Sequence, residues 1–208
     1  MAAQRLDKII ASTGRWSRRE VKDLVRQGRV TVDGVPARSA EEKADPEQAV
    51  IAVNGEKLNW RRYTWVMLNK PAGYLSATED GRGATVLDLL PQDLQRQGLF
   101  PVGRLDKDTE GLLVITSDGQ LAHRIISPKH EVGKVYYARL DGELTDEDVA
   151  ALEAGIHIRD ADGEFDARPA KLRRDGGDAA YIRVTEGKYH QVKRMFAARG
   201  KHVVYLKR

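Results

Sequence analysis

A polar, acid-rich stretch between two apolar segments is the feature that most constrains this chain. The polar run 103–111 follows the apolar segment 100–102 and precedes the apolar segment 112–115. Both flanks are short and apolar, as buried strands are. The acids between them, Asp106, Asp108 and Glu110, are therefore expected on a loop held by a sheet, where proteins tend to place functional groups. We predict that this loop forms the active site.

The spacing of these three acids is compatible with several kinds of site. Carboxylates two residues apart suit paired acid–base hydrolysis, a divalent metal site or a single carboxylate nucleophile. Acidic runs also occur as solvated loops without chemistry. The local sequence leaves all four interpretations open.

Composition excludes some classes of protein. The chain has 208 residues and no cysteine, so disulfides and thiolate metal sites are absent. No signal peptide and no apolar run of membrane-spanning length is present, which predicts a soluble, cytoplasmic protein with no membrane partner. The five histidines are scattered, and no phosphate loop or dinucleotide fingerprint occurs. We therefore expect neither a metal nor a cofactor.

Positive charge is concentrated at both ends of the chain. Residues 1–38 contain nine Lys or Arg against four Asp or Glu, and residues 182–208 contain eight against one. Acids gather in the middle, at 141–153. Two basic ends on a chain of net charge +4 predict a polyanionic partner, of which nucleic acid is the commonest.

Two short amphipathic helices are predicted near the N-terminus, with apolar residues at 6, 9 and 10 and at 21, 24 and 25. Ser17 and Glu20 match a capping box that begins the second helix. Basic residues four apart then form one stripe on that helix, which could follow phosphates or could be a solvated face. The candidate RNA-binding residues are Arg15, Arg18, Arg19, Lys22 and Arg26.

The helices are followed by a predicted hairpin. The alternating strand 29–32 ends at the turn Asp33-Gly34, and a second strand at 50–53 ends at Asn54-Gly55. The motifs Arg5-Leu6-Asp7-Lys8, Ser17-Arg18-Arg19 and 28–34 resemble the S4 RNA-binding module. By this resemblance, residues 1–60 form a small helix-helix-hairpin RNA-binding domain, followed by a catalytic domain over 61–208.

The second domain is predicted to be a mixed, largely antiparallel α+β fold, because its strands and helices interleave irregularly. The expected strands are 65–68, 134–140 and 181–184, and the expected helices are 85–90, 121–126, 145–154 and 191–199. The last residues, 203–208, look like the middle of a strand. We therefore expect further C-terminal strands to be missing after Arg208.

Two cations could serve Asp106 if it is a nucleophile. Burial raises the pKa of a carboxyl group unless a cation lies beside it, and Arg104 and Lys193 are the candidates. Lys193 lies in the segment 186–196, which is basic on one side and apolar on the other, and it could instead contact phosphate. Tyr136 could stack on a base, but without further context the sequence favours core packing on a strand.

Four ordered motifs together resemble the bacterial rRNA pseudouridine synthases of the RsuA family. The motifs are Gly103-Arg104-Leu105-Asp106 with Thr109 and Gly111-Leu112-Leu113, Leu68-Asn69-Lys70-Pro71 with Gly73, Lys134-Val135-Tyr136, and Glu186-Gly187-Lys188-Tyr189-His190-Gln191-Val192-Lys193-Arg194-Met195-Phe196. An S4 module precedes the catalytic domain in that family too. The segment 189–196 is most similar to the small-subunit (16S) rRNA member.

The resemblance implies a role for each candidate residue. Asp106 would be the catalytic aspartate, Lys193 its paired cation, and Tyr136 the ring that stacks on the uracil, with Tyr137 as the alternative. Val192 would line the pocket and Arg104 would help to hold the flipped nucleotide. Asp108 and Glu110 lie outside the motif and are interpreted as loop acids.

The implied reaction is the isomerisation of one uridine of 16S rRNA, uridine 516 by the same resemblance, to pseudouridine. No cofactor is implied. The expected partner is structured ribosomal RNA in a pre-ribosomal small-subunit particle, bound by a monomer. Alternatives are a large-subunit (23S) synthase of the same family, a non-catalytic S4-type RNA-binding or assembly protein, and a glycoside hydrolase using Asp106 and Glu110.

Overall fold

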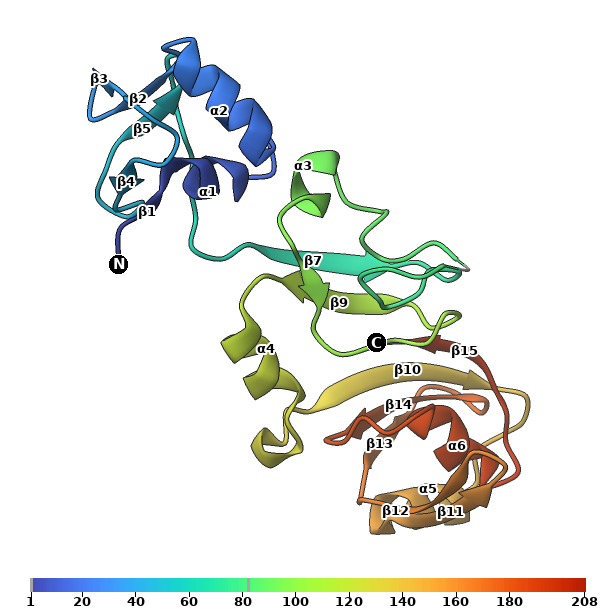
Figure 1. Ribbon diagram of the computed structural model, residues 1–208. Coiled ribbons are helices and arrows are strands. Elements are labelled where there is room, and N and C mark those ends of the chain that lie inside the picture. Colours follow the sequence, from blue (N-terminus) through green and yellow to red (C-terminus); the bar gives the residue numbers. More distant parts are fainter. Residues whose placement is uncertain (1, 82) are drawn as a thin grey trace. The chain divides into compact units, whose positions relative to one another are not determined.

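The computed structural model describes residues 2–81 and 83–208, which form two compact units (Figure 1). The first comprises Met1–Trp65 and Leu87–Phe100, and the second comprises Val66–Val86 and Pro101–Arg208. Both combine helices with antiparallel strand pairs. The predicted α+β class is therefore confirmed.

The first unit begins with the two predicted amphipathic helices. A short strand β1 (Gln4–Arg5) leads into α1 (Leu6–Ala11), and α2 (Arg18–Arg26) follows. The capping box is present, because the Ser17 hydroxyl accepts a hydrogen bond from the Glu20 N–H and the Glu20 carboxylate accepts one from the Ser17 N–H. The apolar faces of both helices are buried in one core.

Short strands complete that core. The sheet order is β3-β2-β5-β6, with β2 at Val30–Val32, β3 at Val35–Pro36, β5 at Ile51–Val53 and β6 at Glu56–Lys57. A separate pair joins β1 to β4 (Lys43–Ala44). Both predicted hairpin turns are formed, and their residues Asp33, Gly34, Asn54 and Gly55 have positive φ, as tight hairpin turns require.

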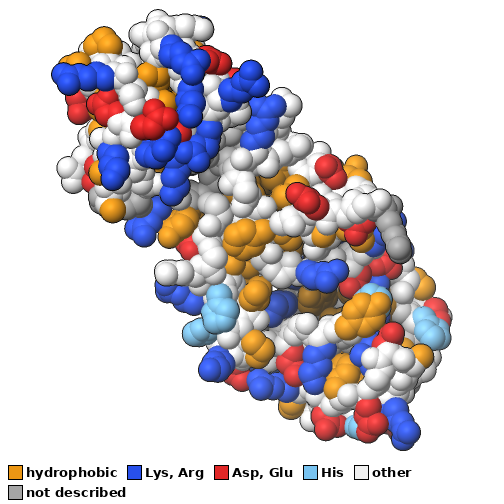
Figure 2. Space-filling view, in the orientation of Figure 1, with side chains coloured by type: hydrophobic (Ala, Val, Ile, Leu, Met, Phe, Trp, Pro, Cys, Tyr) orange, Lys and Arg blue, Asp and Glu red, His pale blue; other side chains and the backbone are white. Residues whose placement is uncertain are grey.

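Each cation of the predicted basic stripe on α2 lies beside an acid. Arg18 lies 2.9 Å from the buried Asp7, Lys22 lies 3.4 Å from Glu41, and Arg26 lies 2.9 Å from Asp23. Burial opposes the charge of Asp7, but hydrogen bonds from Arg5 and Arg18 outweigh it and lower the Asp7 pKa. Figure 2 shows Lys and Arg side chains interspersed with acids over this unit. Much of the stripe is thus neutralised within the protein.

Residues 87–100 pack with the first unit although they follow the first strand of the second. Gln97 donates a hydrogen bond to the Thr13 carbonyl at 2.9 Å and accepts one from the Thr64 hydroxyl at 2.7 Å. Gly14 approaches α3 (Gln92–Gln95) so closely that a Cβ there would collide with the Asp93 carbonyl. These contacts fix the segment to the N-terminal helices.

The prediction of a helix at 85–90 is wrong. Thr85 instead forms a parallel bridge with Leu75, and the Val86 N–H donates to the Leu75 carbonyl at 2.9 Å. The few residues left before Pro91 form turns. So short a segment cannot offset the cost of nucleating a helix, while Val86 and Leu90 are buried without one.

The second unit contains two larger sheets. The first has the order β7-β9-β8, with β7 at Trp65–Lys70, β8 at Phe100–Pro101 and β9 at Gly111–Thr116. The loop that carries Asp106 therefore connects two neighbouring strands, as the sequence predicted. The helix α4 (Gly119–Ile126) and a 3-10 turn at Pro128–His130 follow β9.

The other sheet is antiparallel, in the order β13-β14-β10-β15. Its strands are β10 (Lys134–Leu140), β13 (Lys171–Arg174), β14 (Ala179–Val184) and β15 (Val203–Lys207). The helices α5 (Asp146–Ala154) and α6 (Gln191–Ala197) and the hairpin of β11 (Ile156–Asp160) and β12 (Gly163–Ala167) lie together on one side of it (Figure 1). Their apolar residues form one core with the inner face of the sheet.

No helix formed by the described residues is long and apolar enough to cross a membrane.

Candidate active site

The loop with Asp106 is fixed at its backbone by a buried serine. The Ser76 hydroxyl donates to the Leu105 carbonyl at 2.8 Å and accepts from the Leu105 N–H at 3.0 Å. Leu105 itself is buried, next to Asp106. Because both backbone groups of Leu105 are held by one side chain, the direction of the chain at Asp106 is well defined.

A buried lysine holds the other end of the loop. The Lys70 ammonium is inaccessible to solvent and donates to the carbonyls of Pro71, Lys107 and Thr109 at 3.0, 3.1 and 2.8 Å. The Gly73 N–H also donates to the Lys107 carbonyl, at 2.7 Å. Burial lowers the pKa of Lys70, although the acids of the loop oppose this shift. The motif Asn69-Lys70-Pro71 with Gly73 is thus the support of the Asp106 loop.

Replacing Lys70 by methionine is expected to destabilise the protein. Three carbonyls would lose a charged donor in a site closed to water, at a cost of about 1–3 kcal/mol. For a protein of this size, this corresponds to a fall in Tm of roughly 3–10 °C. Thermal unfolding followed by circular dichroism measures the fall. The matched control is Lys107→Met, whose side chain is exposed, and an equal fall in both variants would contradict this role of Lys70.

The loop is also joined to β15. The Leu112 N–H donates to the Arg208 carbonyl at 2.9 Å, and the Arg208 N–H donates to the Glu110 carbonyl at 2.9 Å. Gly111 lies at φ +103°, where a Cβ would collide with the Arg208 carbonyl, so the close approach requires glycine here. The Arg208 side chain donates to the Leu112 carbonyl at 2.8 Å. The two sheets of the second unit therefore meet beside the Asp106 loop.

Two side chains contact the Asp106 carboxylate. The Lys193 ammonium lies 3.2 Å from Asp106 Oδ2, and His190 Nε2 lies 3.5 Å from Asp106 Oδ1. Lys193 also lies 2.6 Å from the Asp108 carboxylate. Asp106 is therefore approached at each of its oxygens by a different side chain, and one lysine bridges two acids.

The bridging contacts stabilise the charged forms of the groups that share them. Burial disfavours the Lys193 ammonium, but its bonds to Asp108 and Asp106 raise the Lys193 pKa overall. Burial likewise disfavours the Asp108 carboxylate, and the hydrogen bond from Lys193 lowers the Asp108 pKa. At neutral pH Lys193 is thus a cation, and Asp108 is an anion.

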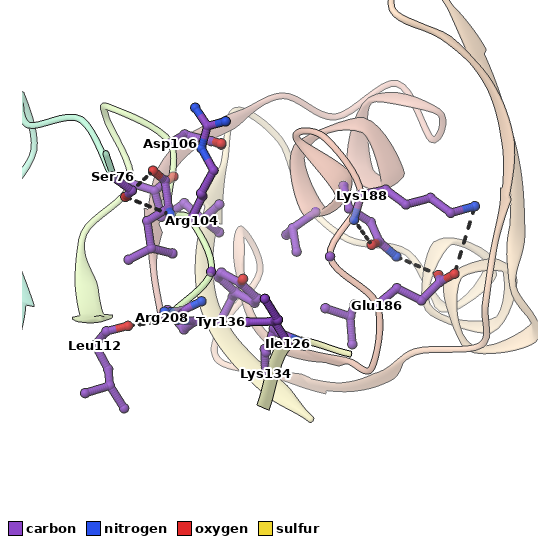
Figure 3. Close-up of a pocket in the computed structure, with 18 of the residues that line it drawn as sticks. Ser76, Arg104, Asp106, Leu112, Ile126, Lys134, Tyr136, Glu186, Lys188 and Arg208 are labelled. Atoms are coloured by element: carbon purple, nitrogen blue, oxygen red, sulfur yellow. Dashed lines mark hydrogen bonds and ion pairs between the residues drawn. The ribbon is translucent and has the colours of Figure 1, made fainter. Parts of the chain in front are cut away.

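A network of side chains orders the turn before α6. The Glu186 carboxylate accepts from the Gln191 side-chain amide at 2.9 Å, and the Gln191 oxygen accepts from the Lys188 N–H at 3.0 Å (Figure 3). His190 is left-handed, with φ +47°, and stacks on Tyr189 with ring centroids 3.8 Å apart. This turn directs Lys193, one turn further on, toward the Asp106 loop.

The helix α6 is fixed from behind by Arg194. Its guanidinium donates to both oxygens of Asp160 at 2.7 and 2.8 Å and to the Gly163 carbonyl at 2.8 Å. It also lies over the Phe165 ring. Two adjacent residues of α6 thus point in different directions. Arg194 binds the β11–β12 hairpin, and Lys193 contacts Asp106 and Asp108.

A cavity of about 920 Å³ lies in front of Asp106. Its walls come from the Asp106 loop, from β9, β10 and α4, and from the segment 186–192 (Figure 3). Arg104, Tyr136 and Val192 all line it, as does His190. Cavities of this size, largely apolar with a few convergent polar groups, are typical of small-molecule or nucleotide sites.

The structure separates the two tyrosines that the sequence left as alternatives. Tyr136 lines the cavity, whereas Tyr137 is on the opposite face of β10, 5.1 Å from Tyr181 between ring centroids. Burial raises the pKa of Tyr136, and the nearby Arg208 only partly offsets this. The Tyr136 phenol is therefore protonated at neutral pH.

One polar atom beside the cavity lacks a hydrogen-bond partner within the described part of the chain. It is the hydroxyl of Thr109, a residue only 1% exposed. Buried hydroxyls are normally satisfied. The Thr109 N–H donates to the Asp106 carbonyl at 3.1 Å, so this threonine belongs to the same turn as the aspartate.

Comparison with known proteins identifies the family. The profile described as RNA pseudouridylate synthase matches residues 64–198, and that of the S4 domain matches residues 4–50. The chain belongs to the RNA pseudouridylate synthase family. It is an RNA pseudouridine synthase, an isomerase, with an RNA-binding S4 domain in front.

The similar proteins align with nearly the whole length of this chain. An uncharacterized RNA pseudouridine synthase of Bacillus subtilis, YtzG, is 49% identical over 98% of this chain and 86% of its own. The ribosomal small subunit pseudouridine synthase A of Escherichia coli is 41% identical over 98% of this chain and 87% of its own. A crystal structure of a pseudouridylate synthase is 36% identical, with a TM-score of 0.65, and covers 98% and 86% of the two chains.

Several residues of the synthase site were missed by sequence reasoning. Asp108 was interpreted as a loop acid, and it does lie exposed, but its carboxylate shares Lys193 with Asp106. His190 was only one of five scattered histidines in the sequence, and the structure places it 3.5 Å from Asp106. Ser76 had no sequence signal of any kind. For His190, the signal was its place three residues before Lys193, within one helical turn.

The predicted RNA-binding residues lie in the other unit. Arg18, Lys22 and Arg26 have the acidic neighbours described above, and Arg15 lies 3.4 Å from Glu56 and over the Trp16 ring. Arg19 is exposed on α2. Among the described residues, no cluster of three or more His, Cys, Asp or Glu has the arrangement of a metal site.

Proposed function

We propose that this synthase isomerises one specific uridine of small-subunit 16S rRNA, at position 516. The observation that carries the choice of RNA is the 41% identity, over 98% of the chain, to a protein named ribosomal small subunit pseudouridine synthase A. The segment 189–196, which resembles the small-subunit member, supports the same choice. The substrate is ribosomal RNA in a pre-ribosomal small-subunit particle in the cytoplasm.

Asp106 is proposed as the catalytic nucleophile. It is the acid of the loop that lines the cavity, and its two oxygens are approached by Lys193 and His190. Lys193 is the group proposed to hold the Asp106 carboxylate in place, through a contact of 3.2 Å to Asp106 Oδ2.

The remaining groups are proposed to hold the nucleotide. Tyr136 presents a ring at the cavity wall, where a uracil could stack, and Val192 supplies an apolar contact. Arg104 lines the cavity from the Asp106 loop and is exposed, so its guanidinium is available to the phosphates of a flipped nucleotide. Flipping costs a few kcal/mol, which these contacts would offset.

The reaction has simple requirements. The N1–C1′ bond breaks, the uracil rotates, and C5 forms the new bond to C1′. C5 then loses its proton, and N1 gains one. The product is an isomer of the substrate, so no electrons are gained or lost. The protein has to supply a nucleophile, hold the detached base and mediate the proton transfer.

The S4 domain is proposed to bind structured rRNA through its two helices. Arg15, Arg19 and the stripe of Arg18, Lys22 and Arg26 are the candidate contacts. Since the stripe already has acidic neighbours, phosphates would have to compete with Asp7, Glu41 and Asp23 for these cations. Arg19 is exposed, forms no ion pair with an acid among the described residues and is the most readily available.

Mapping pseudouridine at nucleotide resolution tests the proposed target. Unmodified small-subunit and large-subunit rRNA, free and in immature particles, are incubated with the protein. A single new pseudouridine in the small-subunit RNA is expected, with the large-subunit RNA unchanged. A new pseudouridine only in large-subunit RNA would overturn the target and leave the enzyme class intact.

A further inference from the structure

The sheet β13-β14-β10-β15 has a second face that the active site does not use. Side chains alternate along a strand, and Tyr136, Ala138 and Leu140 of β10 turn to the core and the cavity. The intervening residues point the other way. The strand register places the following residues on this outer face: Val135, Tyr137, Arg139, Lys171, Arg173, Ala179, Tyr181, Arg183, Tyr205 and Lys207.

Tyrosines form the centre of this face. The Tyr137 ring lies 5.1 Å from Tyr181 and 6.4 Å from Tyr205 between centroids. The flanking arginines lie over these rings, with Arg173 4.4 Å from the centroid of Tyr181 and Arg139 5.6 Å from that of Tyr205. Three neighbouring strands thus display aromatic rings edged by guanidinium groups.

The surface is open and positively charged. Val135 is 49% exposed, and Arg139, Arg173, Arg183, Lys171 and Lys207 are all exposed. One acid that contacts this face is Glu110, which accepts a hydrogen bond from the Tyr205 hydroxyl at 2.9 Å. The cations of this face are therefore accessible, because no described residue covers them.

The charges on this face differ from those on α2 in one respect. Each cation of the α2 stripe lies within 3.4 Å of a carboxylate of the protein. Arg139, Arg173 and Lys207 form no such ion pair with the described residues. Arg174, on the inner face of the strand that carries Arg173, does form an ion pair, 2.7 Å from Asp146. Unpaired cations on a sheet suggest that the counter-charge comes from a bound partner.

We propose that this outer face binds an unpaired segment of RNA, separately from the cavity that holds the reacting uridine. Tyrosine rings on a sheet are a common platform for stacking unpaired bases, and arginine contacts both phosphates and base planes. The cations at the edges would follow the backbone. The proposal holds for either rRNA target.

Other occupants fit less well. A second copy of the chain would bring five like charges against five, which disfavours association through this face. An acidic protein would neutralise the charges, but this would not account for the three adjacent tyrosine rings with arginines over them. RNA uses both features, and the enzyme acts on RNA.

A pair of matched double variants tests the proposal. Arg139→Gln with Arg173→Gln removes two charges from the outer face, and Arg159→Gln with Arg174→Gln removes two from elsewhere in the same unit. Binding of a fluorescent oligouridine is measured by anisotropy over a range of salt concentrations. The first variant should bind about 10-fold more weakly, and its slope of log K against log salt should fall by about 1.4, since each lost phosphate contact of a single strand contributes about 0.7.

A second measurement locates the contact and is independent of charge. Oligonucleotides containing 4-thiouridine are photocrosslinked to the wild-type protein, and the modified residues are identified by mass spectrometry. Crosslinks to Tyr137, Tyr181 or Tyr205 are expected, and Tyr137→Leu should remove them while leaving Tm close to that of the wild type. Equal affinity and slope in the two double variants, together with no crosslink on these strands, would overturn the proposal. So would binding of an acidic protein, but not of the oligonucleotide, at this face.

Discussion

Replacing Asp106, the proposed nucleophile, by asparagine is expected to reduce isomerisation by at least about 10⁴-fold, as the loss of a nucleophile does in other enzymes. Asparagine has nearly the same shape as aspartate, so the cavity should keep its form. The Ser76 bonds to Leu105 and the Lys70 bonds to the loop do not depend on the Asp106 side chain. Rate is lost because the amide cannot attack carbon.

Single-turnover formation of pseudouridine measures this effect, and anisotropy with the same RNA measures binding. RNA affinity should change by less than about 3-fold, since asparagine removes a negative charge and no contact to phosphate. The matched control is Asp108→Asn, which alters a carboxylate that shares Lys193 but lies exposed on the loop. Activity of Asp106→Asn within 10-fold of wild type would exclude the nucleophile assignment.

Replacing Lys193 by glutamine is expected to lower kcat by about 10²–10³-fold, the usual effect of removing one preorganised charge or donor from an active site. Lys193 lies 3.2 Å from Asp106 and 2.6 Å from Asp108. Without its charge, the carboxylates of Asp106 and Asp108 would both lose the ammonium group that now contacts each of them. The carboxylate of Asp106 would then lose the ion pair that holds it in position.

The charge and the position of Lys193 can be tested separately. Lys193→Arg keeps the charge and should retain more activity than the glutamine variant. Lys188→Gln removes a lysine from the same segment whose ammonium lies over the Phe165 ring and is exposed, and its kcat should be near that of the wild type. Equal losses in Lys188→Gln and Lys193→Gln would show that the segment needs positive charge for RNA binding and not beside Asp106.

Lys193 also connects the two halves of the catalytic unit. It comes from α6, which Arg194 anchors to the β11–β12 hairpin, whereas Asp106 comes from the loop between β8 and β9. The salt bridge therefore joins a helix packed in the core of the β13-β14-β10-β15 sheet to the loop between two strands of the β7-β9-β8 sheet.

Local sequence signals predicted the elements with short-range causes. The capping box at Ser17 set the start of α2, and the Asp-Gly and Asn-Gly pairs set the hairpin turns, because each depends on hydrogen bonds or φ values within a few residues. The helix at 191–197 was found from its apolar spacing. These elements need no knowledge of the remainder of the chain.

Other elements could not be read so directly. The segment 85–90 has the apolar spacing of a helix, but its first residues pair with Leu75 in a short parallel bridge. The hairpin at 156–167 was missed, although Asp162-Gly163 is a turn signal between alternating segments. Ser76 and Lys70 support the Asp106 loop through backbone carbonyls, and no pattern in a sequence reports which carbonyl a distant side chain will meet.

The sequence by itself determined the kind of residues in the site and their family, because the motifs around Asp106, Lys70, Tyr136 and Lys193 are contiguous in the chain. The tertiary structure alone decided how they meet. Alternate residues of a strand face opposite sides of a sheet, so Tyr136 and Tyr137 differ in role only through which face of β10 carries the cavity. The same packing left a tyrosine and arginine surface on the other face, with no counter-charge from the described chain.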